Sequence, residues 1–141
     1  MTNVKEIREY LKRTERLLQI WDTKVDKRKV YLNTVLTSDS GLRLPIWGQA
    51  PFTPKDVEAC GAVGCLAGWA FVYAQIHKKT EQRDPLRAAA YYYGVEAYPW
   101  SGGQGEHLFY GKTTKTTHWQ EARTRLVSRI RQLKRMIQDS Q

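Results

Sequence analysis

The side chains with the clearest capacity for chemistry are the cations near the end of the chain. Residues 110–141 hold eight Lys and Arg against two Asp and Glu, which gives a net charge of +6. Residues 1–36 hold nine against five (+4), and residues 37–109 hold six against seven (−1). If the two ends pack side by side, they form one basic surface, and such a surface attracts phosphate-bearing partners or acidic proteins.

The predicted ligand-binding site is therefore a basic face on a C-terminal helix. Guanidinium and ammonium groups spaced along a helix bind phosphates, and the predicted contacts are Arg123, Arg125, Arg129, Arg131, Lys134 and Arg135. Lys27, Arg28 and Lys29 form a second predicted patch. The alternative is a solvated helix face, because arginine also supports helix formation. The expected partner is a nucleic acid, a nucleotide second messenger or an acidic protein.

An aromatic cluster follows in residues 91–100. Tyr91, Tyr92 and Tyr93 are consecutive, so on a helix they point three ways and cannot all be buried. An exposed aromatic ring beside basic side chains can stack a base or anchor a partner, and the predicted contacts are Tyr92, Tyr98 and Trp100. Packing in the core and at its rim is the competing interpretation.

Metal and nucleophilic chemistry have weaker support. The available zinc-ligand types are Cys60, Cys65, His77, His107 and His118. Their spacing does not fit a compact zinc finger, and on one straight helix Cys65 and His77 would lie about 18 Å apart. Apolar surroundings favour packing for the cysteines over a role as nucleophile. We therefore expect no metal, no cofactor and no catalytic residue.

Two further function classes remain open. A small nuclease or nucleotide hydrolase would use His107 or His118 with a carboxylate, although the chain has no Walker loop and no dinucleotide fingerprint. A structural subunit of a larger assembly, including a homo-oligomer, would use the amphipathic ends of the chain as interfaces. Metal-dependent turnover would identify the first class, and a stable oligomer without an anionic ligand would identify the second.

Length and composition predict a single domain over residues 1–141. The chain is 41% hydrophobic and 26% charged, which is ordinary for a soluble globular protein. Its first residues are charged from position 5 and lack the apolar region of a secretory signal. No stretch is apolar for the roughly 20 residues that a membrane span needs. We expect a cytoplasmic protein without membrane contact.

The stretch 60–76 is expected to lie at the centre of the fold. Between residues 62 and 74 it carries no charged side chain, and a helix that is apolar on nearly every face is normally buried. Gly64 and Gly68 are four residues apart and would share a face, so another backbone can approach there. This pattern predicts a buried central helix at about residues 63–77.

Amphipathic helices are predicted at both ends of the chain. Residues 3–21 place apolar side chains at helical spacing, with Asn3 as the N-terminal cap and Asp22-Thr23 as a point where the helix can end. Thr117 and Gln120 form a capping-box pattern at the start of the last helix. The apolar face of that helix comprises Trp119, Ala122, Leu126, Ile130, Leu133 and Ile137.

The segments between these helices are less regular. Residues 25–38 hold β-branched side chains that favour a strand, but a lone strand has nothing to pair with, so we favour a helix at 27–36. Pro85 predicts the start of another helix and Gly94 its end. A helical turn at 106–110 is expected to carry Leu108 into the core. Together these elements predict a mainly α fold: one compact helical domain around a buried central helix, with amphipathic N- and C-terminal helices.

One segment resembles a known pattern, CGTxxCxAGWA, which occurs in small, mostly uncharacterised proteins of bacteriophages and bacterial mobile elements. The segment is Cys60-Gly61-Ala62-Val63-Gly64-Cys65-Leu66-Ala67-Gly68-Trp69-Ala70. The likeness covers roughly residues 45–110, through Ile46-Trp47, the alanine-rich stretch ending at Gly94, and Leu108-Phe109. It departs at Ala62, where threonine is usual, and in the basic helices at both ends.

The resemblance implies a small phage-type protein in the host cytoplasm and assigns no catalytic residue. Such proteins are often accessory factors that block host defence or redirect host machinery. Combined with the basic ends of the chain, it leads us to predict a non-enzymatic counter-defence protein. Such a protein would inhibit or redirect a host system by binding an anionic partner through its basic helical face.

Overall fold

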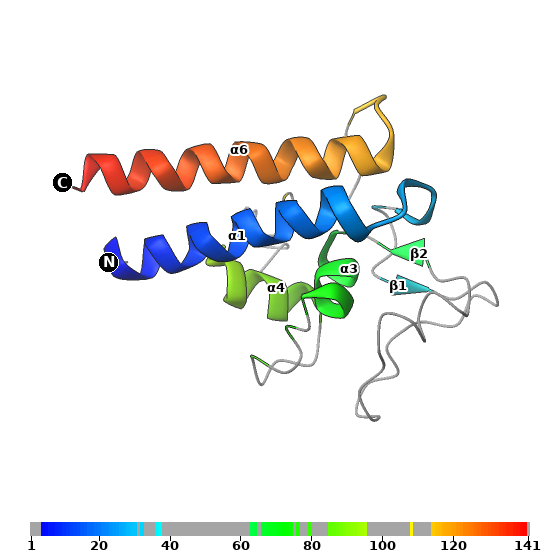
Figure 1. Ribbon diagram of the computed structural model, residues 1–141, viewed down its shortest axis with the longest axis horizontal. Helices are drawn as coiled ribbons and strands as arrows, with labels where there is room; N and C mark the ends of the chain where they lie inside the picture. The colour runs from blue at the N-terminus through cyan, green and yellow to red at the C-terminus, as the bar shows by residue number, and fades with distance from the viewer. Residues whose placement is uncertain are drawn as a thin grey trace.

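The computed structural model describes residues 4–30, 32, 36–37, 63–64, 66–74, 76, 79, 85–95, 108 and 114–140. Its elements, in chain order, are α1 (Val4–Lys24), the 3-10 turn η1 (Lys27–Lys29), β1 (Leu36–Thr37), β2 (Val63–Gly64), α3 (Leu66–Tyr73), α4 (Pro85–Tyr93) and α6 (His118–Asp139) (Figure 1). The protein is mainly helical, as the sequence predicted.

Two long helices, α1 and α6, form the main framework. They run antiparallel and pack along most of their length, so both ends of the chain lie at one end of the pair (Figure 1). The shorter helices α3 and α4 pack on each other, and α4 also packs on α1. On α6 the predicted apolar face is buried at Trp119, Ala122, Leu126, Ile130 and Leu133 and half-buried at Ile137. The prediction of amphipathic terminal helices is confirmed.

Helix α1 continues through the Asp22-Thr23 pair to Lys24. The Thr23 hydroxyl donates a hydrogen bond to the backbone oxygen of Gln19 at 2.7 Å, within the helix. Asp22 binds Arg123 of α6. Both polar side chains are therefore satisfied without ending the helix. The predicted cap Asn3 lies outside the described residues.

The helix favoured at 27–36 is wrong. Asp26 caps a single 3-10 turn by accepting a hydrogen bond from the Arg28 N–H, and Val30 is already extended. Strand β1 then pairs antiparallel with β2, with Leu36 opposite Gly64 and Thr37 opposite Val63. The sequence argument failed because the partner strand comes from a segment that was assigned to the central helix.

The buried central helix is confirmed, but it is shorter than residues 63–77. Val63–Gly64 forms β2, and α3 begins at Leu66. Leu66, Trp69 and Ala70 are almost wholly buried. The Trp69 indole N–H donates to the backbone oxygen of Lys29 at 2.9 Å, which fastens α3 to η1. Cys60 and Cys65 lie outside the described residues.

Helix α4 ends at Gly94 as predicted. Gly94 has a φ of +75°, the left-handed conformation that favours glycine at a helix end. The N–H of Val95 donates to the oxygen of Ala90 at 2.9 Å, which satisfies one carbonyl of the last turn. Ala88, Ala89 and Ala90 are buried, so α4 lies close against its neighbours.

The start of α6 is tied to the rest of the core by specific contacts. The Thr117 hydroxyl accepts a hydrogen bond from the Gln120 N–H at 3.2 Å, which confirms the predicted cap. The Trp21 indole N–H donates to the backbone oxygen of Trp119 at 3.2 Å, joining α1 to α6. Leu108 is buried, as expected, while the rest of the predicted turn at 106–110 lies outside the described residues.

Candidate functional site

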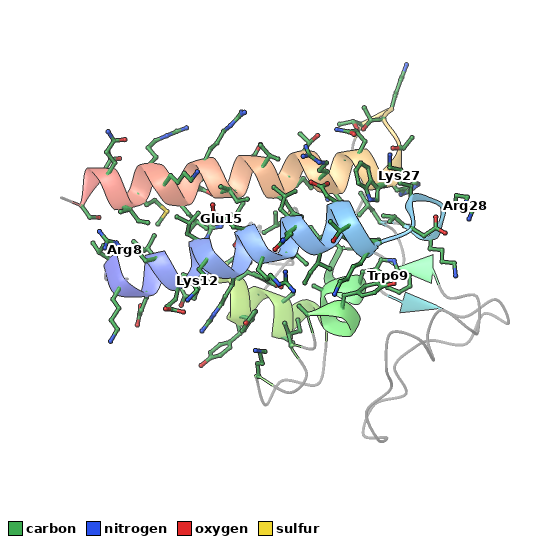
Figure 2. All side chains as sticks on the ribbon, viewed as in Figure 1. Arg8, Lys12, Glu15, Lys27, Arg28 and Trp69 are labelled. Atoms are coloured by element: carbon green, nitrogen blue, oxygen red, sulfur yellow. The ribbon has the colours of Figure 1, made fainter. Side chains whose placement is uncertain are left out.

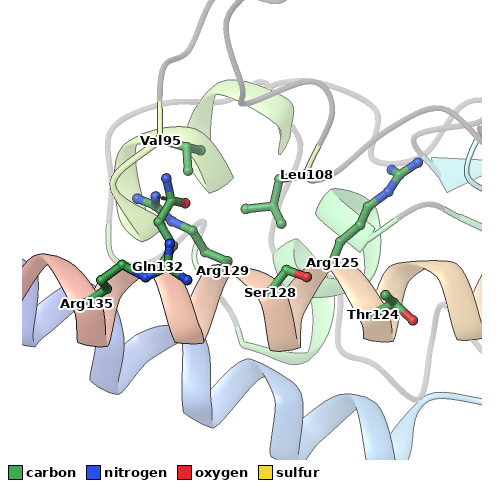
Figure 3. A pocket seen from close by; sticks show the side chains of 8 residues that line it. All are labelled: Val95, Leu108, Thr124, Arg125, Ser128, Arg129, Gln132 and Arg135. Carbon is green, nitrogen blue, oxygen red and sulfur yellow. Dashed lines mark hydrogen bonds between the residues drawn. The ribbon is translucent and has the colours of Figure 1, made fainter.

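The six predicted cations of α6 do not lie on one face of the helix. Arg123 faces α1, where it binds Asp22. Lys134 follows it by eleven residues, about three helical turns, so it lies on that side, while Arg131, eight residues after Arg123, lies about 80° around the helix. The other three cations, Arg125, Arg129 and Arg135, line a pocket on another side of α6 (Figure 3). The cations expected on a single basic face are thus spread around the helix.

Arg123 holds the two long helices together. Its Nε lies 2.8 Å from Oδ1 of Asp22 and its Nη2 lies 3.2 Å from Oδ2, a two-point contact between α6 and α1. The hydrogen bond to Asp22 raises the pKa of Arg123. This cation already has a carboxylate partner within the protein.

Arg125 is also paired. It binds Glu121, one helical turn earlier, and both side chains are largely removed from solvent. Glu121 accepts two further hydrogen bonds from Thr114, from the backbone N–H at 2.7 Å and from the hydroxyl at 2.6 Å. Burial lowers the pKa of Arg125, and the nearby Glu121 partly offsets that effect. The pair fixes the segment that leads into α6.

Arg129 is buried, which contradicts its predicted place on an exposed face. Only 9% of the residue is accessible to solvent. Its Nη1 donates to Oε1 of Gln132 at 2.8 Å and its Nη2 donates to the backbone oxygen of Gly94 at 2.9 Å. Its Nε has no hydrogen-bond partner in the described part of the chain. Burial lowers the pKa of Arg129, and no described carboxylate offsets this effect.

Arg131, Lys134 and Arg135, which we call the terminal cations, are exposed on the second half of α6. No ion pair joins any of them to another of the described residues. The only acidic residue on this half of the helix is Asp139. The terminal cations are therefore available to a partner.

The second predicted patch, on η1, lies at the opposite end of the helix pair from Arg8 (Figure 2). Arg28 is 89% exposed and binds Asp26 at 3.2 Å. The hydrogen bond from Arg28 lowers the pKa of Asp26. Lys27 is exposed, and its Nζ lies 4.5 Å from the ring centre of Trp119. Lys29 is half-buried.

The aromatic prediction is only partly located. Tyr92 is half-buried, and the Arg13 guanidinium lies 4.3 Å from its ring centre, which covers one face of the ring. Tyr91, by contrast, is 67% exposed. The sequence did not single out Tyr91, because three consecutive tyrosines give no local signal of which one faces solvent. Tyr98 and Trp100 lie outside the described residues.

The histidine that the structure describes has a structural contact. Nδ1 of His118 accepts a hydrogen bond from the Leu32 N–H at 2.9 Å. Among the described residues, no three His, Cys, Asp or Glu side chains gather closely enough to hold a metal ion. His107 lies outside this part of the chain. In the same described part, no helix has the length and apolar character to cross a membrane.

The pocket beside α6 has a volume of about 480 Å³. Its wall on α6 consists of Thr124, Arg125, Ser128, Arg129, Gln132 and Arg135, and Val95 and Leu108 close the other side (Figure 3). The sequence identified three of these cations but not the pocket, because Val95 and Leu108 reach it only through the tertiary fold.

Comparison of the chain with protein-family models, with curated proteins and with solved structures finds no match. Charge and geometry are thus the basis for assigning a function.

Proposed function

We propose that this protein is a non-enzymatic accessory protein that binds a nucleic acid through the exposed cations of α6. The observation that carries the proposal is the exposure of the terminal cations without an ion pair to any described residue. A cation that meets a phosphate releases condensed counterions, and this release supplies much of the affinity for nucleic acids.

The surroundings of the terminal cations favour a polyphosphate over an acidic protein. Protein interfaces usually contain a core of exposed apolar or aromatic side chains. Among the described residues, the exposed large hydrophobic side chain is Tyr91, which belongs to α4. The second half of α6 offers charge without such a core, which suits a phosphate backbone.

The second patch extends the proposed contact. Lys27 and Arg28 lie next to the start of α6, and the terminal cations lie on its second half. The terminal cations follow the start of α6 by 13 to 17 residues, which is about 20–26 Å along the helix. A nucleic acid that lies along α6 can therefore contact both groups of cations.

The resemblance of residues 60–70 to proteins of bacteriophages supports a biological setting. In this proposal the protein acts in the cytoplasm of a bacterial host. It inhibits or redirects a host system, such as a defence system, by occupying the nucleic acid on which that system acts. No catalytic step is needed for this role.

The test is binding of a fluorescently labelled 20-base-pair DNA duplex, measured by anisotropy at 50 and 200 mM salt. Replacing Arg131 and Lys134 with glutamate should weaken binding at least tenfold. It should also reduce the slope of log K against the logarithm of the salt concentration by about two, one for each lost phosphate contact. A matched control replaces Lys5 and Lys12 of α1 with glutamate. Both lysines are exposed, and the change in net charge is the same. Because these positions lie outside the proposed contact, the affinity of the control variant for the duplex should fall threefold or less.

The proposal is wrong if the wild-type protein does not bind the duplex at 50 mM salt. It is also wrong if the α6 variant and the α1 control lose equal affinity, since net charge alone would then explain the binding. Recovery of cleaved duplex would contradict the non-enzymatic part and support a nuclease. Unfolding in urea should show that both double variants remain as stable as the wild type, because all four side chains are exposed.

A further inference from the structure

Arg129 is a buried cation whose charge is not balanced by any described carboxylate. It lies 9% exposed beside the pocket, and both of its described hydrogen bonds end on neutral oxygens, those of Gln132 and Gly94. Burying an unpaired charge is unfavourable, so buried cations usually meet an anion. Arg125, four residues earlier on the same side, has such a partner in Glu121. The contrast indicates that Arg129 lacks an anionic partner among the described residues and can accept one from a ligand.

The pocket has the size and the lining of a site for a small ligand. Its volume of about 480 Å³ lies in the range of small-molecule sites. The guanidinium of Arg129 lines the pocket, and so does that of the exposed Arg135. Guanidinium groups present paired donors that match phosphate geometry. The hydroxyl of Ser128 adds a donor on the same wall.

The described residues on the opposite wall of the pocket are apolar. Val95 and Leu108 face the cations of α6 across the cavity (Figure 3). A bare inorganic anion would leave this wall unused and much of the volume empty. A ligand with a phosphate at one end and an apolar or planar group at the other would use both walls.

We propose that the pocket lined by Arg129 binds a small organic phosphate of about the size of a nucleoside monophosphate. This site is separate from the proposed nucleic-acid contact at Arg131 and Lys134, and only Arg135 lies close to both. The phosphate meets Arg129 and Arg135, and the base or other apolar group lies against Val95 and Leu108.

The test is isothermal titration calorimetry with the four ribonucleoside monophosphates, the four matching nucleosides and inorganic phosphate. At least one monophosphate should bind with a Kd below 1 mM. Its nucleoside and inorganic phosphate should each bind at least tenfold more weakly, because each occupies only one wall. The proposal fails if no monophosphate binds, or if inorganic phosphate binds as tightly as the monophosphates do.

Two variants locate the binding. Arg129→Met removes the buried charge and keeps a long side chain, and it should weaken the monophosphate about ten- to a hundredfold. Ser128→Trp fills the cavity from an exposed position on α6, so folding should be preserved while binding is lost. Gln138→Trp is the matched control, since it places the same ring at an exposed position that does not line the pocket.

Binding that survives both Arg129→Met and Ser128→Trp would overturn the assignment to this pocket. The duplex experiment separates the two proposals. Ser128→Trp should bind the labelled duplex like the wild type, and the Arg131 and Lys134 double variant should bind the monophosphate like the wild type. Failure at one site therefore leaves the other measurable.

Discussion

Replacing Gly94 with alanine should destabilise the fold for two separable reasons. Gly94 adopts a φ of +75°, where a residue with a Cβ is strained by about 1–2 kcal/mol. A Cβ at this position would also lie 2.6 Å from Cε2 of Tyr10 and closer to two other carbons of that ring. Forcing an extra atom into a packed site costs about 1–3 kcal/mol. Alanine also lowers the conformational entropy of the unfolded chain, which stabilises the folded state by about 0.4–1 kcal/mol.

The net loss expected for Gly94→Ala is therefore about 1–4 kcal/mol in the free energy of unfolding. Urea denaturation followed by circular dichroism measures it directly. The same substitution in a Tyr10→Ala background removes the overlap with the ring and leaves only the backbone strain. In that background we expect a cost of about 1 kcal/mol or less. The difference between the two backgrounds is the coupling between Gly94 and Tyr10.

A control separates strain from overlap. Gly94→Asn carries a Cβ but tolerates the left-handed conformation better than alanine does. In the Tyr10→Ala background it should therefore be less destabilising than Gly94→Ala. Equal costs of Gly94→Ala in the two backgrounds would refute the argument from the Tyr10 ring, and a cost near zero in both would refute the argument from φ as well.

Two further predictions concern caps. Thr117→Ala should lower the free energy of unfolding by about 1 kcal/mol, because the Gln120 N–H loses its acceptor. Thr117→Ser keeps a hydroxyl and should retain most of the stability in urea. Equal urea midpoints for the alanine and serine variants would contradict the cap. The hydrogen bond from Arg28 lowers the pKa of Asp26 below 3.8, so the stabilisation from this pair is present above about pH 4 and is lost as the pH falls through the native pKa. A carboxyl titration by NMR should show a midpoint below 3.8 that rises in Arg28→Ala, whereas an unchanged midpoint would exclude the pair as the cause.

Much of the helical structure could be predicted because its signals are local. The spacing of apolar side chains in α1 and α6, the Thr117 cap and the Gly94 terminus all depend on residues within about one or two turns. These features were confirmed by the structure. The apolar run around Trp69 likewise predicted a buried helix, because exposing apolar side chains on every face of a helix to water is unfavourable.

The places where prediction failed depend on residues far apart in the chain. Strand β1 at Leu36 exists because Gly64 pairs with it, and neither segment shows this alone. Arg129 was expected on an exposed face, since its spacing on the helix does not reveal that the end of α4 lies against that side, where the Gly94 backbone oxygen accepts a hydrogen bond from Arg129. The sequence thus showed that the last helix is basic but could not show which of its cations are buried.

By itself, the sequence determined a mainly helical protein with two basic, amphipathic ends, because helix periodicity, capping and net charge are properties of neighbouring residues. Only the tertiary structure decided how those cations are used. It paired Arg123 with Asp22, 101 residues away. It buried Arg129 beside a pocket and left Arg131 and Lys134 exposed. The physical reason is that burial and ion pairing depend on which surfaces meet in space, and that is decided when the whole chain packs.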